Sequence, residues 1–180
     1  MIKYLKNKKF QKGVTIIELM IYIGLLSIFI LVLVDVFVTI LNTKLESEST
    51  STLNQDARYI YSRLAYDVEN ADSISLPASL GVEEHILQVT RDGITDTYKR
   101  DDVSGDLKLT TSDGTGTTMK LNGDDTTLTK LTFTRLGPPG EKPTVKVSFT
   151  IKSLIILPSG DQTRTIDTTF GLRPFPTPIP

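Results

Sequence analysis

Gly13-Val14-Thr15-Ile16-Ile17-Glu18 joins a lysine-rich head to a long apolar run, and this stretch decides how the chain is interpreted. No acidic residue precedes it, but five lysines do: Lys3, Lys6, Lys8, Lys9 and Lys12. The sixteen residues from Leu19 to Val34 then carry no charge. Glu18 therefore stands at the entrance of a segment of membrane length, where an acid costs free energy and usually has a function.

The apolar segment is long enough to cross a membrane. A spanning helix needs about 20 mainly apolar residues, and Val14–Val34 supplies 21 with Glu18 as its only charge. A secretory signal fits less well, because the uncharged core is longer than usual and no A-x-A-like cleavage site follows it. A plain signal anchor remains an alternative. The lysines predict a cytoplasmic N-terminus and an exported remainder.

The stretch resembles the class III signal of type IV prepilins and pseudopilins. That family has a short basic leader ending in Gly, then an apolar helix with Glu at its fifth residue, and Glu18 is fifth when counting starts at Val14. The resemblance implies that residues 1–13 are a leader, and that a prepilin peptidase cuts between Gly13 and Val14 and N-methylates Val14. The basic leader residues nearest the cut are Lys8, Lys9 and Lys12.

The resemblance also implies an assembly role for Glu18, which in a filament meets the amino group of Val14 on a neighbouring subunit. A free α-amino group is cationic near neutral pH, and a buried carboxylate needs a partner. The helix macrodipole favours a carboxylate in the first turn as well. The alternative is that Glu18 only reaches the lipid headgroups.

Ala57–Ala71 is similar to the helix of J-type minor pseudopilins and W-type minor pilins. Their R-x-L-x-x-D-x-x-x-A signature is matched by Arg63, Leu64, Asp67 and Ala71. Many major pilins have a helix-bending proline where Asp35 stands, and its absence is commoner in minor subunits. The alternative is an ordinary amphipathic helix with a local Arg63–Asp67 pair, worth about 0.2–0.5 kcal/mol.

The periodicity predicts one long helix in two parts. We expect residues 14–41 to form the transmembrane and assembly helix, and residues 42–76 to continue it as an amphipathic helix. The polar residues 42–52 predict a thin or frayed stretch, and Pro77 marks the latest end. Apolar residues return at helical spacing at Leu53, Ala57, Ile60, Leu64, Val68 and Ala71.

Residues 77–172 are expected to form a β-rich head, followed by a proline-rich tail at 173–180 that is extended or disordered. Asp92-Gly93 predicts a tight hairpin, and Gly137–Gly140 a loop within an antiparallel pair. The expected strands are His85–Arg91, Ile94–Arg100, Asp106–Thr111, Thr126–Arg135, Thr144–Leu157 and Thr163–Phe170. The fold class is α+β: a pilin-like lollipop whose exposed helix half packs on an antiparallel sheet.

Composition excludes several kinds of chemistry. The absence of cysteine excludes disulfides, thiol catalysis and cysteine-bound zinc. Loss of the leader takes five of the 20 basic residues and none of the 21 acidic ones, so the mature net charge is −6 and no nucleic acid partner is expected. His85 is the only histidine, and near a strand start we interpret it as a surface residue rather than a catalytic base.

Paired or glycine-flanked acids raise the possibility of a metal. Some pseudopilins bind calcium in such loops, and calcium prefers oxygen ligands. No EF-hand spacing is present, and turn chemistry explains Asp beside Gly. We therefore expect no metal and no cofactor, with calcium as the alternative at Asp101-Asp102, Asp113-Gly114 and Asp124-Asp125.

The leading hypothesis is a structural subunit, not an enzyme. The chain would be a bacterial minor pilin or pseudopilin of a type IV pilus or a type II secretion-like pseudopilus. The likeness to J-type and W-type subunits implies that it is part of the initiating tip complex. Its expected partners are other subunits, the prepilin peptidase and the inner-membrane assembly machinery. The subunit would cross the cytoplasmic membrane once, with its head exported, and later join an extracellular or periplasmic filament.

Two other classes of function stay open. One is a binding module, a tip adhesin or DNA-uptake pilin, which an exposed aromatic or basic cluster on the sheet would favour. The other is a membrane-anchored enzyme or sensor, which the lack of a P-loop, dinucleotide or zinc-protease motif disfavours.

Overall fold

The computed structural model describes residues 13–137 and 143–172. The leader lysines, the centre of the expected loop at 138–142 and the tail at 173–180 lie outside the described residues. The chain divides into two compact units, Met1–Thr43 and Lys44–Pro180, and each is described by itself.

A single α-helix, α1, runs from Ile16 to Glu69 without interruption. In the first unit its surface is apolar all round, which is typical of a helix surrounded by lipid or by other subunits. The few hydroxyls satisfy themselves within the helix, since Ser27 and Thr39 each donate to the carbonyl four residues earlier, at 2.8 and 2.9 Å. By length and composition this part can cross a membrane: its best window has a mean hydropathy of 2.8 and no buried residue.

In the second unit α1 becomes amphipathic, as expected. The whole predicted apolar stripe is buried: Leu53, Ala57, Ile60, Leu64, Val68 and Ala71. The expected fraying at 42–52 is not seen, because the helix continues through these residues and Thr52 donates to the carbonyl of Glu48 at 2.9 Å. The helix ends at Glu69 rather than at residue 76, because the backbone of Asp72 already bonds to Thr90 and the chain enters a sheet.

One antiparallel sheet has five strands in the order β1-β3-β4-β5-β6. The Asp92-Gly93 hairpin is confirmed: both residues have positive φ angles, 50° and 79°, as a tight two-residue turn requires. The short strands β1 and β6 carry no periodic signal and were not predicted. The strand bounds are β1 Ser73–Leu76, β3 Ile86–Arg91, β4 Ile94–Arg100, β5 Leu107–Thr111 and β6 Thr118–Lys120.

The remaining strands form a second antiparallel sheet, in the order β2-β7-β8-β9, so the expectation of one sheet was wrong. The predicted antiparallel pair β7–β8 is confirmed. The expected strand to Leu157 ends earlier, at Ser153, because Leu154 turns away and bonds to the carbonyl of Asp125 at 2.8 Å. The bounds are β2 Glu83–Glu84, β7 Thr126–Leu136, β8 Thr144–Ser153 and β9 Thr163–Gly171.

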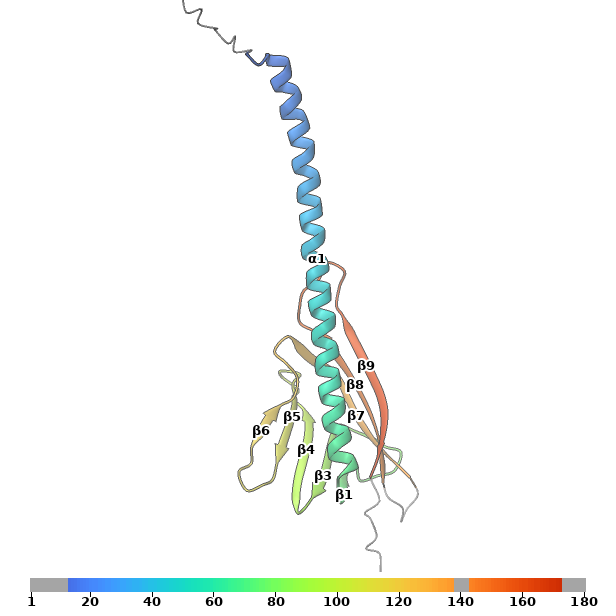
Figure 1. Ribbon diagram of the computed structural model, residues 1–180. Helices are drawn as coiled ribbons and strands as arrows, with labels where there is room; N and C mark the ends of the chain where they lie inside the picture. Colours follow the sequence, from blue (N-terminus) through green and yellow to red (C-terminus); the bar gives the residue numbers. More distant parts are fainter. Residues whose placement is uncertain (1–12, 138–142, 173–180) are drawn as a thin grey trace, which may run out of the picture. The chain divides into compact units, whose positions relative to one another are not determined.

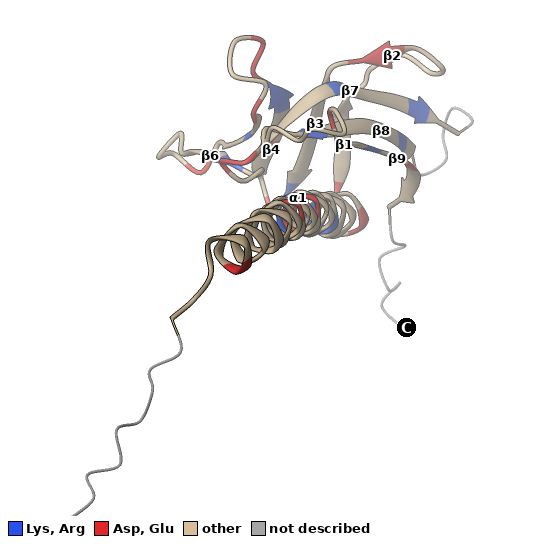
Figure 2. Ribbon diagram, turned by 90° about the horizontal axis from the view of Figure 1, so that it is seen from above, with Lys and Arg blue, Asp and Glu red and all other residues tan. Residues whose placement is uncertain are grey.

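Within the second unit, α1 lies across both sheets (Figures 1 and 2) and its apolar stripe meets their apolar faces. The largest fully buried side chains come from three strands: Tyr98 of β4, Phe133 of β7 and Phe149 of β8. Neither the helix nor a sheet can bury its apolar face alone, so each covers the other. The α+β class is confirmed.

Candidate functional site

The predicted cleavage bond lies in exposed, non-helical chain. Gly13, Val14 and Thr15 precede α1 and form no helix or strand. Val14 is 67% exposed, and nothing lies within 4 Å of where a Cβ of residue 13 would stand. Accessible backbone outside helices and strands is where proteolytic cleavage concentrates.

Thr15 caps the start of α1, a feature that the sequence analysis did not predict. The backbone N–H of Glu18 donates to Thr15 Oγ1 at 3.3 Å, and Leu19 N–H donates to the Thr15 carbonyl at 3.1 Å. Thr15 is therefore the N-cap and Glu18 the third helical residue, which is the spacing of a capping box. This cap fixes the helix to begin two residues after Val14.

Glu18 has one side-chain partner within the described chain, the hydroxyl of Tyr22, which donates to Oε1 at 3.1 Å. Tyr22 follows one helical turn later, so both groups lie on the same face. A carboxylate can accept about four hydrogen bonds, so Glu18 keeps capacity for a further donor. The partial positive charge of the helix N-terminus also stabilises the Glu18 carboxylate. This carboxylate can therefore stay ionised in the first turn and bind a further cation.

Asp67, from the helix signature, is a tertiary anchor rather than only a member of a local pair. Its side chain is 1% exposed. Arg63 Nε donates to Oδ2 at 2.8 Å, and the hydroxyl of the buried Tyr98 on β4 donates to the same oxygen. Arg91 of β3 approaches the other oxygen, with Nη1 at 3.7 Å.

The electrostatics of this cluster follow from burial. Burial raises the pKa of Tyr98, and the negative charge of Asp67 raises it further. Burial acts to lower the pKa of Arg63, but the interactions with Tyr98 and Asp67 outweigh it and the net shift is upward. The Arg63–Asp67 spacing was visible in the sequence, whereas Tyr98 and Arg91 reach Asp67 only through the sheet.

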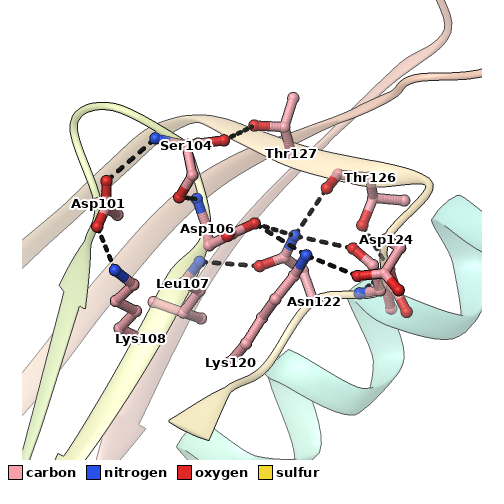
Figure 3. A network of polar contacts seen from close by, with 12 residues as sticks. Asp101, Ser104, Asp106, Leu107, Lys108, Lys120, Asn122, Asp124, Thr126 and Thr127 are labelled. Carbon is pink, nitrogen blue, oxygen red and sulfur yellow. Dashed lines mark hydrogen bonds and ion pairs between the residues drawn. The ribbon is translucent and has the colours of Figure 1, made fainter. Parts of the chain in front are cut away.

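Lysines contact the acids of two of the three acidic loops (Figure 3), whereas Asp113 in the third accepts from Thr115. The Lys108 ammonium and the backbone N–H groups after Asp101 hydrogen-bond to that carboxylate and hold its pKa well below its usual range. Lys120 contacts both Asp106, at 3.2 Å, and Asp124, at 3.0 Å. In the part of the chain that the structure describes, no three His, Cys, Asp or Glu side chains gather to hold a metal.

Buried Asn122 organises the same corner of the head (Figure 3). Its Oδ1 accepts from Leu107 N–H at 2.8 Å, and its Nδ2 donates to the Thr126 carbonyl at 2.7 Å. Asp56 of α1 accepts from Gly123 N–H at 2.8 Å and from the Thr126 hydroxyl, which ties the helix to the start of β7. These polar contacts tie residues 122–126 to β5 and to α1.

His85 lies between β2 and β3 and is exposed. Its Nδ1 lies 2.9 Å from the carbonyl oxygen of Leu131, so in the neutral ring Nδ1 carries the proton and donates it. This backbone partner fits the expected surface role. A general base would instead need a nucleophile within reach.

Comparison with known proteins supports the interpretation of the N-terminal segment. Residues 8–34 match the family described as the prokaryotic N-terminal methylation motif. No curated protein and no solved structure matches the chain. The matched residues contain the predicted cut and the acid of the first helical turn, and the chain therefore carries a class III signal of the type IV prepilin kind.

Proposed function

We propose that the chain is a structural subunit of a type IV filament system, a minor pilin or pseudopilin that is cut after Gly13 and N-methylated at Val14. One observation supports this above all: the methylation motif coincides with an exposed bond directly before a capped apolar helix whose first turn holds an acid. The apolar half of α1 stores the subunit in the cytoplasmic membrane. The β-rich unit is exported.

Assembly follows from the chemistry of the first turn. The cut creates a cationic amino group on Val14, and Glu18 of an adjacent subunit offers a carboxylate with hydrogen-bonding capacity beyond Tyr22. Their pairing fixes the axial register between subunits, because an unpaired charge surrounded by apolar helices is costly.

Within this system we place the subunit among the minor subunits of the initiating tip complex, in a pilus or a type II secretion-like pseudopilus. The Arg63–Asp67 pair of the helix signature supports this subtype, because it is formed, and α1 continues through Asp35 where many major pilins have a proline. The partners in this proposal are other subunits, the prepilin peptidase and the inner-membrane assembly machinery.

The test is incorporation into filaments. Glu18→Ala removes the charge and the Tyr22 contact, whereas Glu18→Gln keeps an acceptor for Tyr22 and loses only the charge. We expect both variants to be cut normally and to fall at least tenfold in filament incorporation, measured by immunoblot of sheared filaments. Ser27→Ala in the same span is the control and should assemble normally. Wild-type incorporation of Glu18→Ala would sink the pairing.

A second candidate function, a head that binds a ligand, is favoured by one observation. Three basic side chains line one cleft of the head: the neighbours Lys99 and Arg100 of β4, and Lys130 of β7. A basic cluster on the sheet is the feature expected of a binding module.

A further inference from the structure

A cleft of about 350 Å³ lies where the chain passes from one sheet of the head to the other. The strand β2 of the second sheet ends at Glu84, and β3 of the first sheet begins at Ile86. His85 is the connecting residue and lines the cleft. Its bond to the carbonyl of Leu131 on β7 spans the crossing and fixes the position of the ring.

A β-bulge shapes the opposite wall. The register between β7 and β8 shifts between Leu128 and Lys130, which leaves Thr129 without a directly opposed residue. Consecutive strand residues normally face opposite sides, but here Thr129 and Lys130 are both exposed and both line the cleft. Bulges commonly re-aim side chains at functional sites. Here the Thr129 hydroxyl donates to the carbonyl of Thr150 on β8 at 3.3 Å, and Lys130 is the charged group that the bulge brings to the cleft.

The cleft is cationic. In the described residues neither Lys99 nor Lys130 forms an ion pair with a carboxylate of this chain, although seven other pairs are formed. Arg100 is held in place by a 2.6 Å hydrogen bond from Nε to the carbonyl of Leu128, which leaves its terminal nitrogens available. The one carboxylate in the lining, Asp102, is 83% exposed and 3.8 Å from Arg100, so it neutralises little of this charge.

The floor of the cleft is apolar. Leu131 is buried and Ile86 is half-buried, and both line it. Charge interactions over such a floor are less screened than on an open surface. The volume of the cleft falls within the range of about 300–1,000 Å³ that is typical of small-molecule sites.

We propose that this cleft binds a small ligand through a phosphate or carboxylate group, with Lys99, Lys130 and Arg100 as the charged partners. Ammonium and guanidinium groups form their strongest hydrogen bonds with such oxyanions. The cleft is locally positive although residues 14–180 carry a net negative charge. Its lining contains three cations, Lys99, Arg100 and Lys130, and one carboxylate, Asp102. It is independent of the processing and assembly of the N-terminal segment.

The test uses the full chain in non-ionic detergent and isothermal titration calorimetry at constant ionic strength. Inorganic phosphate is titrated in one arm and succinate in the other, because the two probes separate a phosphate site from a carboxylate site. We expect saturable one-to-one binding in at least one arm. In the variant with both Lys99→Gln and Lys130→Gln, the affinity should fall at least tenfold.

Lys146→Gln is the matched control, because Lys146 is an exposed lysine of β8 outside the cleft. Its affinity should equal that of the unaltered chain. The charge reversal Lys130→Glu, at an exposed position, should abolish binding while circular dichroism shows an unchanged fold. Absence of saturable binding in both arms, or equal affinity in the double variant and the control, overturns the proposal.

Discussion

The substitution Asp67→Ala tests whether this buried carboxylate stabilises the packing of the β-rich head on α1. Replacing it with Ala leaves the buried hydroxyl of Tyr98 without its acceptor, which costs about 1–3 kcal/mol for such a group. The bond from Arg63 adds only about 0.5 kcal/mol, because the Arg63 side chain is 37% exposed and water replaces the lost partner. We expect the free energy of unfolding to fall by about 1.5–3.5 kcal/mol, the sum of these two losses. This is less than the full loss in a buried pair, since the desolvation cost of the carboxylate disappears too.

The assay is urea unfolding of the full chain in non-ionic detergent, followed by the near-ultraviolet circular dichroism of the tyrosines. A double-mutant cycle between Asp67→Ala and Tyr98→Phe should give a coupling energy of about 1–3 kcal/mol. The cycle with Arg63→Ala should give about 0.5 kcal/mol. Asp167→Ala, at an exposed position of β9, is the control and should change stability by less than about 0.5 kcal/mol. Equal, small coupling in both cycles would refute the anchor and leave only a local helix pair.

Two further predictions concern single substitutions in the head, Tyr98→Phe and Gly105→Ala. The folded pKa of Tyr98 lies above its ordinary value of about 10, so stability is full below that pH and declines above it, where the unfolded state ionises first. In the Tyr98→Phe variant this decline should be smaller. The measurement is the urea midpoint as a function of pH, from below to above about 10. Gly105→Ala should destabilise the head by about 1–3 kcal/mol in thermal melts, because Gly105 has a φ of 72° and a Cβ would overlap the hydroxyl of Thr127. Gly114→Ala, with a φ of 88° in open space, isolates the backbone effect and should cost less.

Most of the fold could be predicted because it rests on local periodicity. The apolar spacing from Leu53 onward predicted the buried helix face, and the alternation of apolar residues predicted β7 almost in full. The division into two sheets could not be predicted, because β7 pairs with β8 and with the two-residue β2 rather than with β6, the strand before it. A strand that short has no readable period.

The candidate sites divide in the same way. The cut and the acid of the first turn lie within the six residues Gly13–Glu18, so a single motif predicts both. The Thr15–Glu18 cap could also have been predicted from its spacing. The cleft could not, because Lys99 and Lys130 are brought together only by the crossing of the sheets and the bulge at Thr129. Local patterns specify chemistry along a helix, whereas a site between sheets depends on register.

The central claim is that proteolysis creates the cation that Glu18 needs. The most direct measurement is the N-terminal mass of the chain recovered from cells with an active prepilin peptidase, compared with cells that lack it. We predict that the chain begins at N-methylated Val14 in the first cells and keeps its leader in the second. A chain that retains Met1–Gly13 in peptidase-competent cells would contradict the account.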